Sequence, residues 1–208
     1  MPFDFAVASF VTLFVVVDPI GLAPAFLAVT DGLDRHQRMR VALRASVIAA
    51  TILIGAALAG DWLLRQLGIS LSAFRIAGGL LLFSIASEMV FGWRGERETR
   101  TAEQAIEEHV RNIAAFPLAI PLLAGPGALT ASVLLASQAD ARPLWLGILI
   151  GTIGLVAAAS FVSFWLAGRI GRLMGVTGNV VLSRLLGVIL AALAVQFVLD
   201  GVRAVWAP

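Results

Sequence analysis

Long hydrophobic stretches, separated by short polar gaps, run along most of the chain. A helix needs about 20 mostly apolar residues to cross a bilayer. Six stretches approach or exceed this length and predict transmembrane helices, at residues 5–29, 42–64, 73–92, 113–137, 143–167 and 181–203. The pattern therefore predicts an all-α integral membrane protein with six transmembrane helices, in contact with the lipid bilayer.

The composition agrees with this pattern and narrows the class of protein. Hydrophobic residues make up 60% of the 208 positions and charged residues 13%, whereas soluble domains carry about 25% charged residues. The chain contains no cysteine, which excludes disulfides and thiolate metal sites, and we expect no resident metal. All 15 basic residues are arginine. Because they fall in short gaps between apolar stretches, membrane orientation explains them better than nucleic-acid binding does.

The arginines also predict how the chain lies in the membrane. If the N-terminus is outside, four of them face the outer side, and the other eleven face the inner side. The four are Arg65, Arg75, Arg142 and Arg203. Because positively charged loops stay in the cytoplasm, we expect a multi-pass protein of the bacterial inner membrane with both termini on the outer, periplasmic side.

The two halves of the chain resemble each other. The stretch RIAGGLLLFSIASEMVFG, beginning at Arg75, lines up with RLLGVILAALAVQFVLDG, beginning at Arg184. Likewise VVVDPIGLAPAF matches PLLAGPGALTAS, with Pro19 opposite Pro126. The partners are 109 and 107 residues apart. Because three spans are an odd number, the second half must insert upside down, and inverted repeats of this kind are typical of secondary transporters.

Much of the charge of the chain lies between the two halves. Glu96 with Arg100 and Glu107 with Arg111 are spaced i,i+4, which favours a small solvated helix. We therefore expect a charged cytoplasmic linker that joins the repeats. The predicted organisation is a first three-helix repeat at 1–92, this linker at 93–112 and an inverted three-helix repeat at 113–208.

Both repeats contain residues that interrupt a helix at membrane depth. Asp18, Pro19 and Gly21 lie in the first span. A charge at that depth costs about 2.5–3.5 kcal/mol on insertion scales, and proline lacks a backbone N–H and clashes with a carbonyl one turn back. The fourth span repeats the interruption at Gly125, Pro126 and Gly127. We therefore predict broken first and fourth helices whose freed backbone groups face an internal cavity.

Two broken spans at matching positions indicate the binding site of a transporter. Helix N-termini at the breaks attract a carboxylate, while Asp18 and freed carbonyls suit an ammonium group, a proton or Na⁺. The alternatives are that Asp18 only caps the half-helix after Pro19, and that the GPG stretch only permits a tight helix crossing. The predicted substrate- and ion-binding residues are Asp18, Pro19, Gly21, Gly125, Pro126 and Gly127, with hydroxyl groups from Thr130 and Ser132.

Two further features bear on gating and assembly. Glu88 lies near the inner end of the third span, where it either reaches the interface or takes part in gating. Gly147 and Gly151 form a GxxxG motif, which lets helices approach closely. The motif is compatible with packing inside the chain and with a homo-oligomer.

The motifs DPIGLAPAFLAVT and PLAIPLLAGPGALTASVLL, together with FRIAGGLLLF, resemble the MarC family of bacterial inner-membrane proteins. The resemblance runs nearly end to end. Some members of that family are described as transporters of small neutral amino acids, such as glycine and alanine, driven by Na⁺ or H⁺. The resemblance implies the same activity here, with a site lined by Asp18, Pro19, Gly21, Gly125, Pro126 and Gly127.

The leading interpretation is a secondary transporter of small neutral amino acids that alternates access around two broken helices. We expect a small-molecule substrate and no cofactor beyond a coupling Na⁺ or H⁺. The alternatives are an exporter or channel for another small metabolite, and a non-transporting membrane scaffold. An enzyme is disfavoured because the two histidines, His36 and His109, fall in charged gaps, away from any nucleophile at membrane depth.

Overall fold

The computed structural model describes residues 2–107, 112–139 and 142–206. Within these residues the chain is helical and contains no strand, so the prediction of an all-α protein is confirmed. His109 and Arg111, and with Arg111 its predicted pairing with Glu107, lie outside the described residues. The helices are α1 (Pro2–Val17), α2 (Ala23–Val29), α3 (Arg35–Gln66), α4 (Leu71–Phe91), α5 (Trp93–Glu107), η1 (Ala114–Leu123), α6 (Pro126–Gln138), α7 (Pro143–Trp165) and α8 (Ala167–Trp206).

Within the described residues, four helices are long and apolar enough to cross a membrane. These are α3, α4, α7 and the part of α8 from Thr177 to Trp206. A fifth span results if η1 and α6, which meet at a bend of 60°, count as one. α1 has 16 residues and is shorter than a full span, because the chain leaves helical geometry at Asp18. By length and composition, the described residues therefore hold four to five spans, and the predicted six are not reached.

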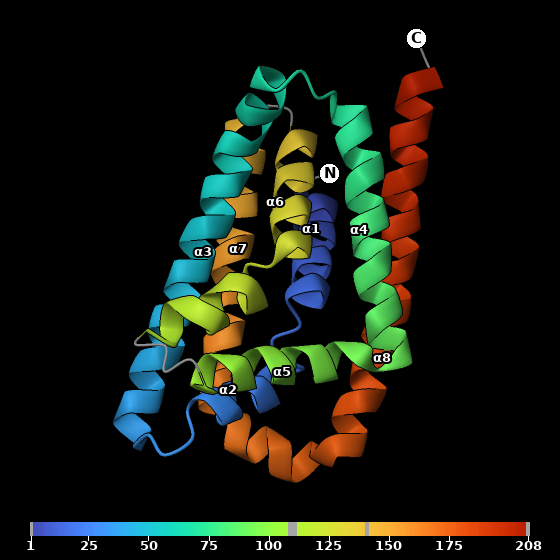
Figure 1. Cartoon of the computed structure of the whole chain (residues 1–208). Coiled ribbons are helices and arrows are strands. Elements are labelled where there is room, and N and C mark those ends of the chain that lie inside the picture. The colour runs from blue at the N-terminus through green and yellow to red at the C-terminus, as the bar shows by residue number, and fades with distance from the viewer. Residues whose placement is uncertain (1, 108–111, 140–141, 207–208) are drawn as a thin grey trace.

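The long helices run side by side, and shorter pieces of helix lie across their lower end (Figure 1). α3, α4, α7 and the second part of α8 extend between the two ends of the molecule, with α1 and α6 among them. α2, α5 and the first part of α8 lie at the lower end. This arrangement places α5 next to both helix breaks, since residues of α5 line cavities together with each of them.

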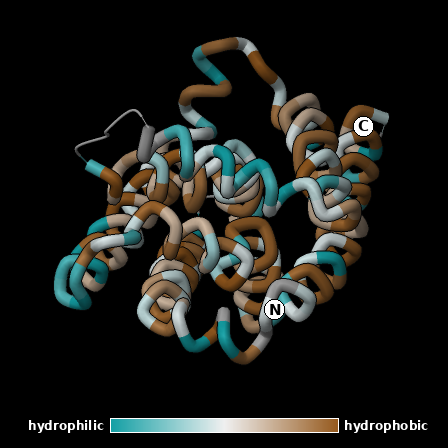
Figure 2. Tube along the Cα trace, turned by 60° about the horizontal axis from the view of Figure 1, so that its bottom comes forward, coloured by the Kyte–Doolittle hydropathy of each residue, from teal (hydrophilic) through white to brown (hydrophobic). Residues whose placement is uncertain are grey.

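The outer surface of the long helices is hydrophobic. Leu80, Leu185 and Val188 are each 59–60% exposed, and Figure 2 shows that the long helices consist mainly of hydrophobic residues. Soluble monomers rarely expose apolar surface on this scale. The surface therefore fits a lipid environment, as expected for an integral membrane protein.

Two glycines, Gly79 of α4 and Gly187 of α8, let these helices pack closely. Of the described helix pairs, α4 and α8 make the most extensive contact. A Cβ at Gly79 would lie 2.7 Å from the carbonyl oxygen of Ala194, and one at Gly187 would lie 2.8 Å from Cβ of Met89. The GxxxG motif at Gly147 is different, because a Cβ there would meet no described atom within 4 Å. Small residues let membrane helices approach closely, and in the described chain Gly79 and Gly187 have this role between α4 and α8.

The charged segment after α4 forms the predicted helix, and the side that carries Glu96 and Arg100 is exposed as expected, whereas the opposite side is buried. Gly92 adopts a left-handed conformation with φ of 86°, and the chain turns there from α4 into α5. Arg94, Glu98 and Ala102 are 5%, 5% and 0% exposed. Their spacing of four residues places them on one face of α5, and that face is covered by the rest of the protein. Burial of this face follows from the position of α5 across the broken helices, which the charge pattern does not reveal.

Candidate functional site

The first break is a tight turn that Asp18 stabilises. α1 ends at Val17, and Asp18 adopts a left-handed backbone conformation with φ of 51°, which Asp tolerates better than most residues. Its Oδ1 accepts a hydrogen bond from the N–H of Gly21 at 3.0 Å. A Cβ at Gly21 would overlap the Asp18 carboxylate, so a larger residue at this position would displace the carboxylate from its hydrogen bond. The turn-capping role considered for Asp18 is therefore present, although its carboxylate is also buried, at 2% exposure.

The second break leaves the start of α6 without a capping side chain. α6 begins at Pro126, and the N-cap residue, Gly125, offers no side chain to its first N–H groups. A Cβ at Gly127 would overlap the side chain of Ile85 and lie 3.2 Å from Cγ1 of Val16. The start of α6 is thus packed close to the end of α1, and it keeps unpaired donors and a partial positive charge.

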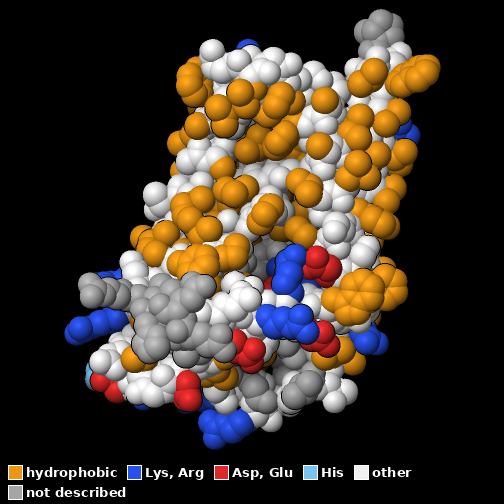
Figure 3. All heavy atoms as spheres, in the orientation of Figure 1, with side chains coloured by type: hydrophobic (Ala, Val, Ile, Leu, Met, Phe, Trp, Pro, Cys, Tyr) orange, Lys and Arg blue, Asp and Glu red, His pale blue; other side chains and the backbone are white. Residues whose placement is uncertain are grey.

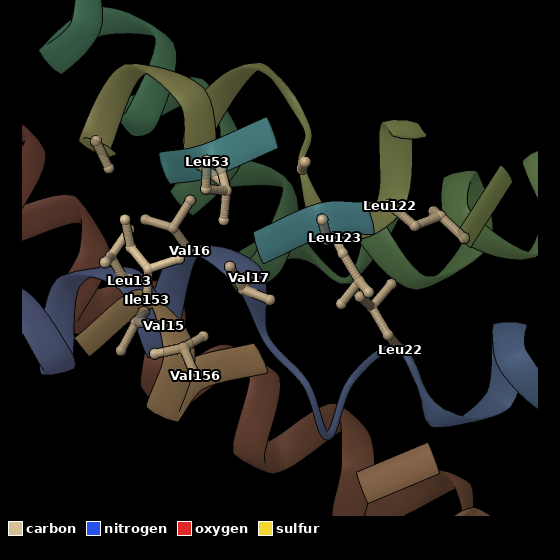
Figure 4. Close-up of a cluster of buried hydrophobic side chains, with 14 of the residues drawn as sticks. Leu13, Val15, Val16, Val17, Leu22, Leu53, Leu122, Leu123, Ile153 and Val156 are labelled. Carbon is tan, nitrogen blue, oxygen red and sulfur yellow. The ribbon is translucent and has the colours of Figure 1, made fainter. Parts of the chain in front are cut away.

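Hydrophobic side chains pack around both breaks (Figure 4). Val16 and Val17 come from the end of α1, and Leu122 and Leu123 come from the end of η1; all four are buried. Val17 and Leu123 line the same small void, of about 10 Å³, together with Leu53 of α3. The two breaks are therefore fixed against each other by an apolar core.

A buried ion pair on α5 lies next to the first break. Nε of Arg94 donates a hydrogen bond to Oε1 of Glu98 at 2.7 Å. Nη2 of Arg94 donates to the carbonyl oxygen of Val16 at 2.8 Å, and Nη1 contacts Sδ of Met89 at 3.2 Å. The Val16 carbonyl belongs to the last turn of α1, where carbonyls lack the usual helical partner and a positive charge is favourable. Arg94 therefore caps the broken end of α1.

We call Asp18, Arg94 and Glu98 the charged cluster. Asp18 interacts electrostatically with both of the other residues, and in their ordinary protonation states the three carry a net charge of −1. Burial raises the pKa of the Glu98 carboxyl, and the guanidinium of Arg94 beside it acts in the opposite direction. Arg97 and Glu88 form a second, more exposed pair at 2.9 Å. This second pair is neutral and leaves the charge of the cluster unbalanced.

Three cavities include parts of the charged cluster in their walls. A cavity of about 680 Å³ at α2, α5 and α8 is lined by Glu98. A second, of about 280 Å³, is lined by Arg94, Glu98 and residues 125–128 at the start of α6. A third, of about 40 Å³, is lined by Asp18, Arg94 and Glu98. Figure 3 shows arginine and acidic side chains gathered mainly around the lower end of this face, below the hydrophobic surface of the long helices.

The structure brings most of the predicted binding residues to these cavities. Those that line them are Asp18, Gly21, Gly125, Pro126 and Gly127. Glu88 does not line them; its Oε1 accepts a hydrogen bond from Arg97, and its Oε2 is buried without a partner among the described residues. Within the described part of the chain, no group of three or more Asp, Glu or His side chains has the geometry to hold a metal ion.

The predicted hydroxyl groups lie elsewhere. Ser132 is fully buried and donates to the carbonyl of Ala128 in its own helix at 2.8 Å, and Thr130 packs its methyl group against Gly78 of α4. Neither residue lines the three cavities around α5, and nor does Pro19, which is buried in the turn. These residues support the breaks and do not face the cavities.

Arg94 and Glu98 are the residues that sequence reasoning missed. Both stand in a segment dense with charge, where ion pairs on a solvated face are the usual arrangement. The signal that marks them is the i,i+4 spacing of Arg94, Glu98 and Ala102. Ala102 is small and lies on the same helix face as Arg94 and Glu98. A small residue there indicates that this face packs against other helices.

Asp18→Asn will preserve the first break, whereas Asp18→Ala will lower the free energy of unfolding by about 1–2 kcal/mol. Asn also tolerates the left-handed conformation, and its side-chain oxygen accepts the same hydrogen bond from Gly21; Ala does neither. Thermal unfolding of both variants in detergent measures the difference. Equal stability of Asp18→Ala and the unchanged protein would contradict this view of the turn.

Comparison with known proteins places the chain in a family. The family model described as MarC family integral membrane protein matches residues 3–206. A UPF0056 membrane protein of Archaeoglobus fulgidus is 40% identical over 199 residues, covering 95% of this chain and 92% of the relative. UPF0056 membrane protein MJ1677 of Methanocaldococcus jannaschii is 37% identical, covering 98% of each chain. UPF0056 membrane protein YhcE of Escherichia coli is 32% identical, covering 98% of this chain and 95% of its own.

No solved structure matches the chain. The matching proteins come from both bacteria and archaea, and their names specify a membrane protein without an activity. The family model covers nearly every position, including both helix breaks and the charged cluster between them. The chain therefore belongs to the MarC family of integral membrane proteins.

Proposed function

We propose that this protein is a secondary transporter of small neutral amino acids, such as glycine and alanine, coupled to a gradient of Na⁺ or H⁺. The observation that carries the proposal is the meeting of two broken helices at one buried charged cluster. Buried ionisable groups and interrupted helices are costly, and we infer that they are retained here because they bind or move a solute. The cavities at the cluster give a small solute room beside both breaks.

Each break offers groups that suit one end of an amino acid. The uncapped start of α6, with Gly125 as its N-cap residue, favours a carboxylate. Asp18 lines the adjoining cavity and favours an ammonium group or the coupling ion. A zwitterion therefore satisfies both breaks at once, which a purely apolar solute does not.

The helix contacts support an inverted repeat with alternating access. α4 packs against α8, α3 against α7 and α1 against α6, so each helix of the first predicted repeat touches its counterpart in the second. We propose that α1 with α2, and η1 with α6, each act as one broken span, which brings the total to six. Transport then proceeds by rocking one repeat against the other around the site, in a cytoplasmic membrane, with both termini on the outer side and α5 on the inner side.

Proteoliposomes test the proposal directly. We expect the unchanged protein to accumulate radiolabelled glycine or alanine under an imposed Na⁺ or pH gradient, and Asp18→Asn to lose most of this accumulation because its turn is intact but its charge is gone. Uptake that survives Asp18→Asn would restrict Asp18 to its role in the turn. Absence of uptake under every gradient, by protein that elutes as a folded species in size-exclusion chromatography, would contradict the amino-acid assignment and favour another small metabolite or a scaffold.

A further inference from the structure

We propose that Arg94 binds the carboxylate of the transported solute, and that Glu98 occupies this carboxylate's place until a proton neutralises it. The inference rests on the proposed transport function and adds its coupling ion and its carboxylate-binding residue. Protonation of Glu98 and docking of a solute carboxylate on Arg94 would then occur together. The coupling ion would be H⁺, with about one proton per solute molecule.

The surroundings of the Arg94 side chain favour the binding of an anion. Its side chain is almost completely buried, yet its only anionic contact within 4.0 Å among the described residues is Glu98. The third nitrogen of the guanidinium faces the sulfur of Met89, a weak acceptor. Hydrogen bonds from a guanidinium to a carboxylate are charge-assisted and strong, so a solute carboxylate that takes the place of Glu98 at Nε keeps Arg94 paired with an anion.

The exchange takes place beside a cavity that already favours negative charge. Arg94 lines the 280 Å³ cavity together with residues 125–128, so the guanidinium and the uncapped start of α6 share one space. No side chain caps the start of α6, and the first residues of this helix line the cavity. Glu98 lines this cavity and both of its neighbours, which gives the Glu98 carboxylate space to move away from Arg94.

Release of Glu98 from Arg94 requires a proton. A buried guanidinium without an anion is strongly unfavourable, so Arg94 is paired before and after the exchange. Once the solute carboxylate pairs with Arg94, an ionised Glu98 would be a buried carboxylate without its partner, which is also strongly unfavourable. The solute is a zwitterion and adds no net charge, so the cluster with its solute carries −1 when Glu98 is ionised and 0 when Glu98 is protonated. Burial already raises the pKa of this carboxyl. The ammonium group of the solute then lies toward Asp18.

The charged groups around Glu98 come from several elements. α2, η1 and α6 carry no ionisable side chain, and Glu88 of α4 is paired with Arg97. The ionisable side chains near Glu98 or along the adjoining walls are therefore Arg94, Arg97, Glu96, Arg100 and Glu103 on α5, Asp18 at the first break, Glu88 on α4 and Arg184 of α8 beside Gly92.

The inference predicts that the affinity for glycine falls as the pH rises. Above the pKa of Glu98 the protonated form becomes rarer as pH rises, so the affinity for glycine should fall about tenfold for each pH unit. Glu98→Gln carries a permanently neutral side chain that keeps the shape of the protonated acid. This variant should bind glycine with an affinity that does not change with pH over the same range. It should also lose pH-gradient-driven accumulation while it still exchanges glycine across the membrane.

The test measures binding of radiolabelled glycine to the purified full chain between pH 5 and pH 8, with Na⁺ or with choline as the only monovalent cation. We expect equal binding in the two salts, uptake of about one proton per glycine from a weakly buffered solution, and no competition from glycinamide, which lacks the carboxylate. Asp61→Asn, at the other end of the molecule in an exposed pair with Arg65, is the matched carboxylate-to-amide control and should keep the pH dependence.

Three outcomes would overturn this inference and leave the proposed function intact. They are glycine transport that requires Na⁺, competition by glycinamide as strong as by glycine, and pH-gradient-driven accumulation by Glu98→Gln. The salt and glycinamide measurements use the unchanged protein, so they decide the matter even if Glu98→Gln does not fold. Failure of the unchanged protein to bind or transport either glycine or alanine would instead overturn the proposed function, and this inference with it.

Discussion

Arg94→Ala will lower the free energy of unfolding by about 3–5 kcal/mol. The substitution leaves the Glu98 carboxylate buried without its partner and the Val16 carbonyl at the end of α1 without its donor. Both losses fall on buried residues. Thermal unfolding in detergent, followed by the loss of the monodisperse peak in size-exclusion chromatography, measures the effect.

Arg65→Ala is the matched control for this prediction. Arg65 also pairs with an acid four residues away on its helix, Asp61, at 2.8 Å, but the two side chains are 77% and 46% exposed. Exposed pairs of this kind contribute about 0.3–0.5 kcal/mol, so the control should be nearly neutral. Similar losses in the two variants would mean that burial of the Arg94 pair has no energetic importance.

A double variant separates pairing from packing. Replacing Arg94 by Met and Glu98 by Leu removes both charges and keeps most of the volume. Because the desolvation of a buried ion pair often offsets its attraction, this variant should recover most of the stability that Arg94→Ala loses. It should still fail to bind glycine, since it lacks the guanidinium. Stability and function are thereby measured separately.

Gly79→Val will destabilise the packing of α4 against α8 by about 1–3 kcal/mol or more. The new Cβ would lie 2.7 Å from the carbonyl oxygen of Ala194 and 3.0 Å from the N atom of Val198. These are backbone atoms of a helix, which cannot rotate away as a side chain does, so the two helices must separate. Thermal unfolding and the yield of folded protein measure the loss.

Gly147→Val is the control on a helix surface that faces outward. A Cβ at Gly147 meets no described atom within 4 Å, so we expect little change in the stability of the single chain. Destabilisation equal to that of Gly79→Val would show that the Gly147 face of α7 is covered by a partner, such as a second copy of the chain. That outcome would contradict the expectation that this face of α7 is free.

Much of the architecture is readable from the sequence. Runs of apolar residues predicted membrane helices, and helices occur at every one of the six positions, although four to five qualify as spans by length and composition. The breaks at Asp18 and Gly125 were predicted correctly, because proline and glycine act locally on the backbone. Local chemistry also explains why Asp18 occupies a left-handed turn.

The sequence pattern does not show which face of each helix is covered. The GxxxG motif at Gly147 is a local pattern, but the close contact in the structure is made by Gly79 and Gly187, whose flanking residues show no such motif. The hydroxyl groups of Thr130 and Ser132 follow a break in sequence and still do not line its cavities. Helical periodicity assigns residues to a common face, and it does not say what that face meets.

The sequence by itself determined that this is a helical membrane protein with two interrupted helices, since hydropathy and helix-breaking residues act over a few neighbouring positions. Only the tertiary structure decided that the charged segment after α4 lies next to both breaks. There it buries Arg94 and Glu98 near the end of α1. The Arg94 guanidinium and the Val16 carbonyl are 78 residues apart in the chain. A contact over that separation depends on how all the intervening helices pack, and no local pattern encodes it.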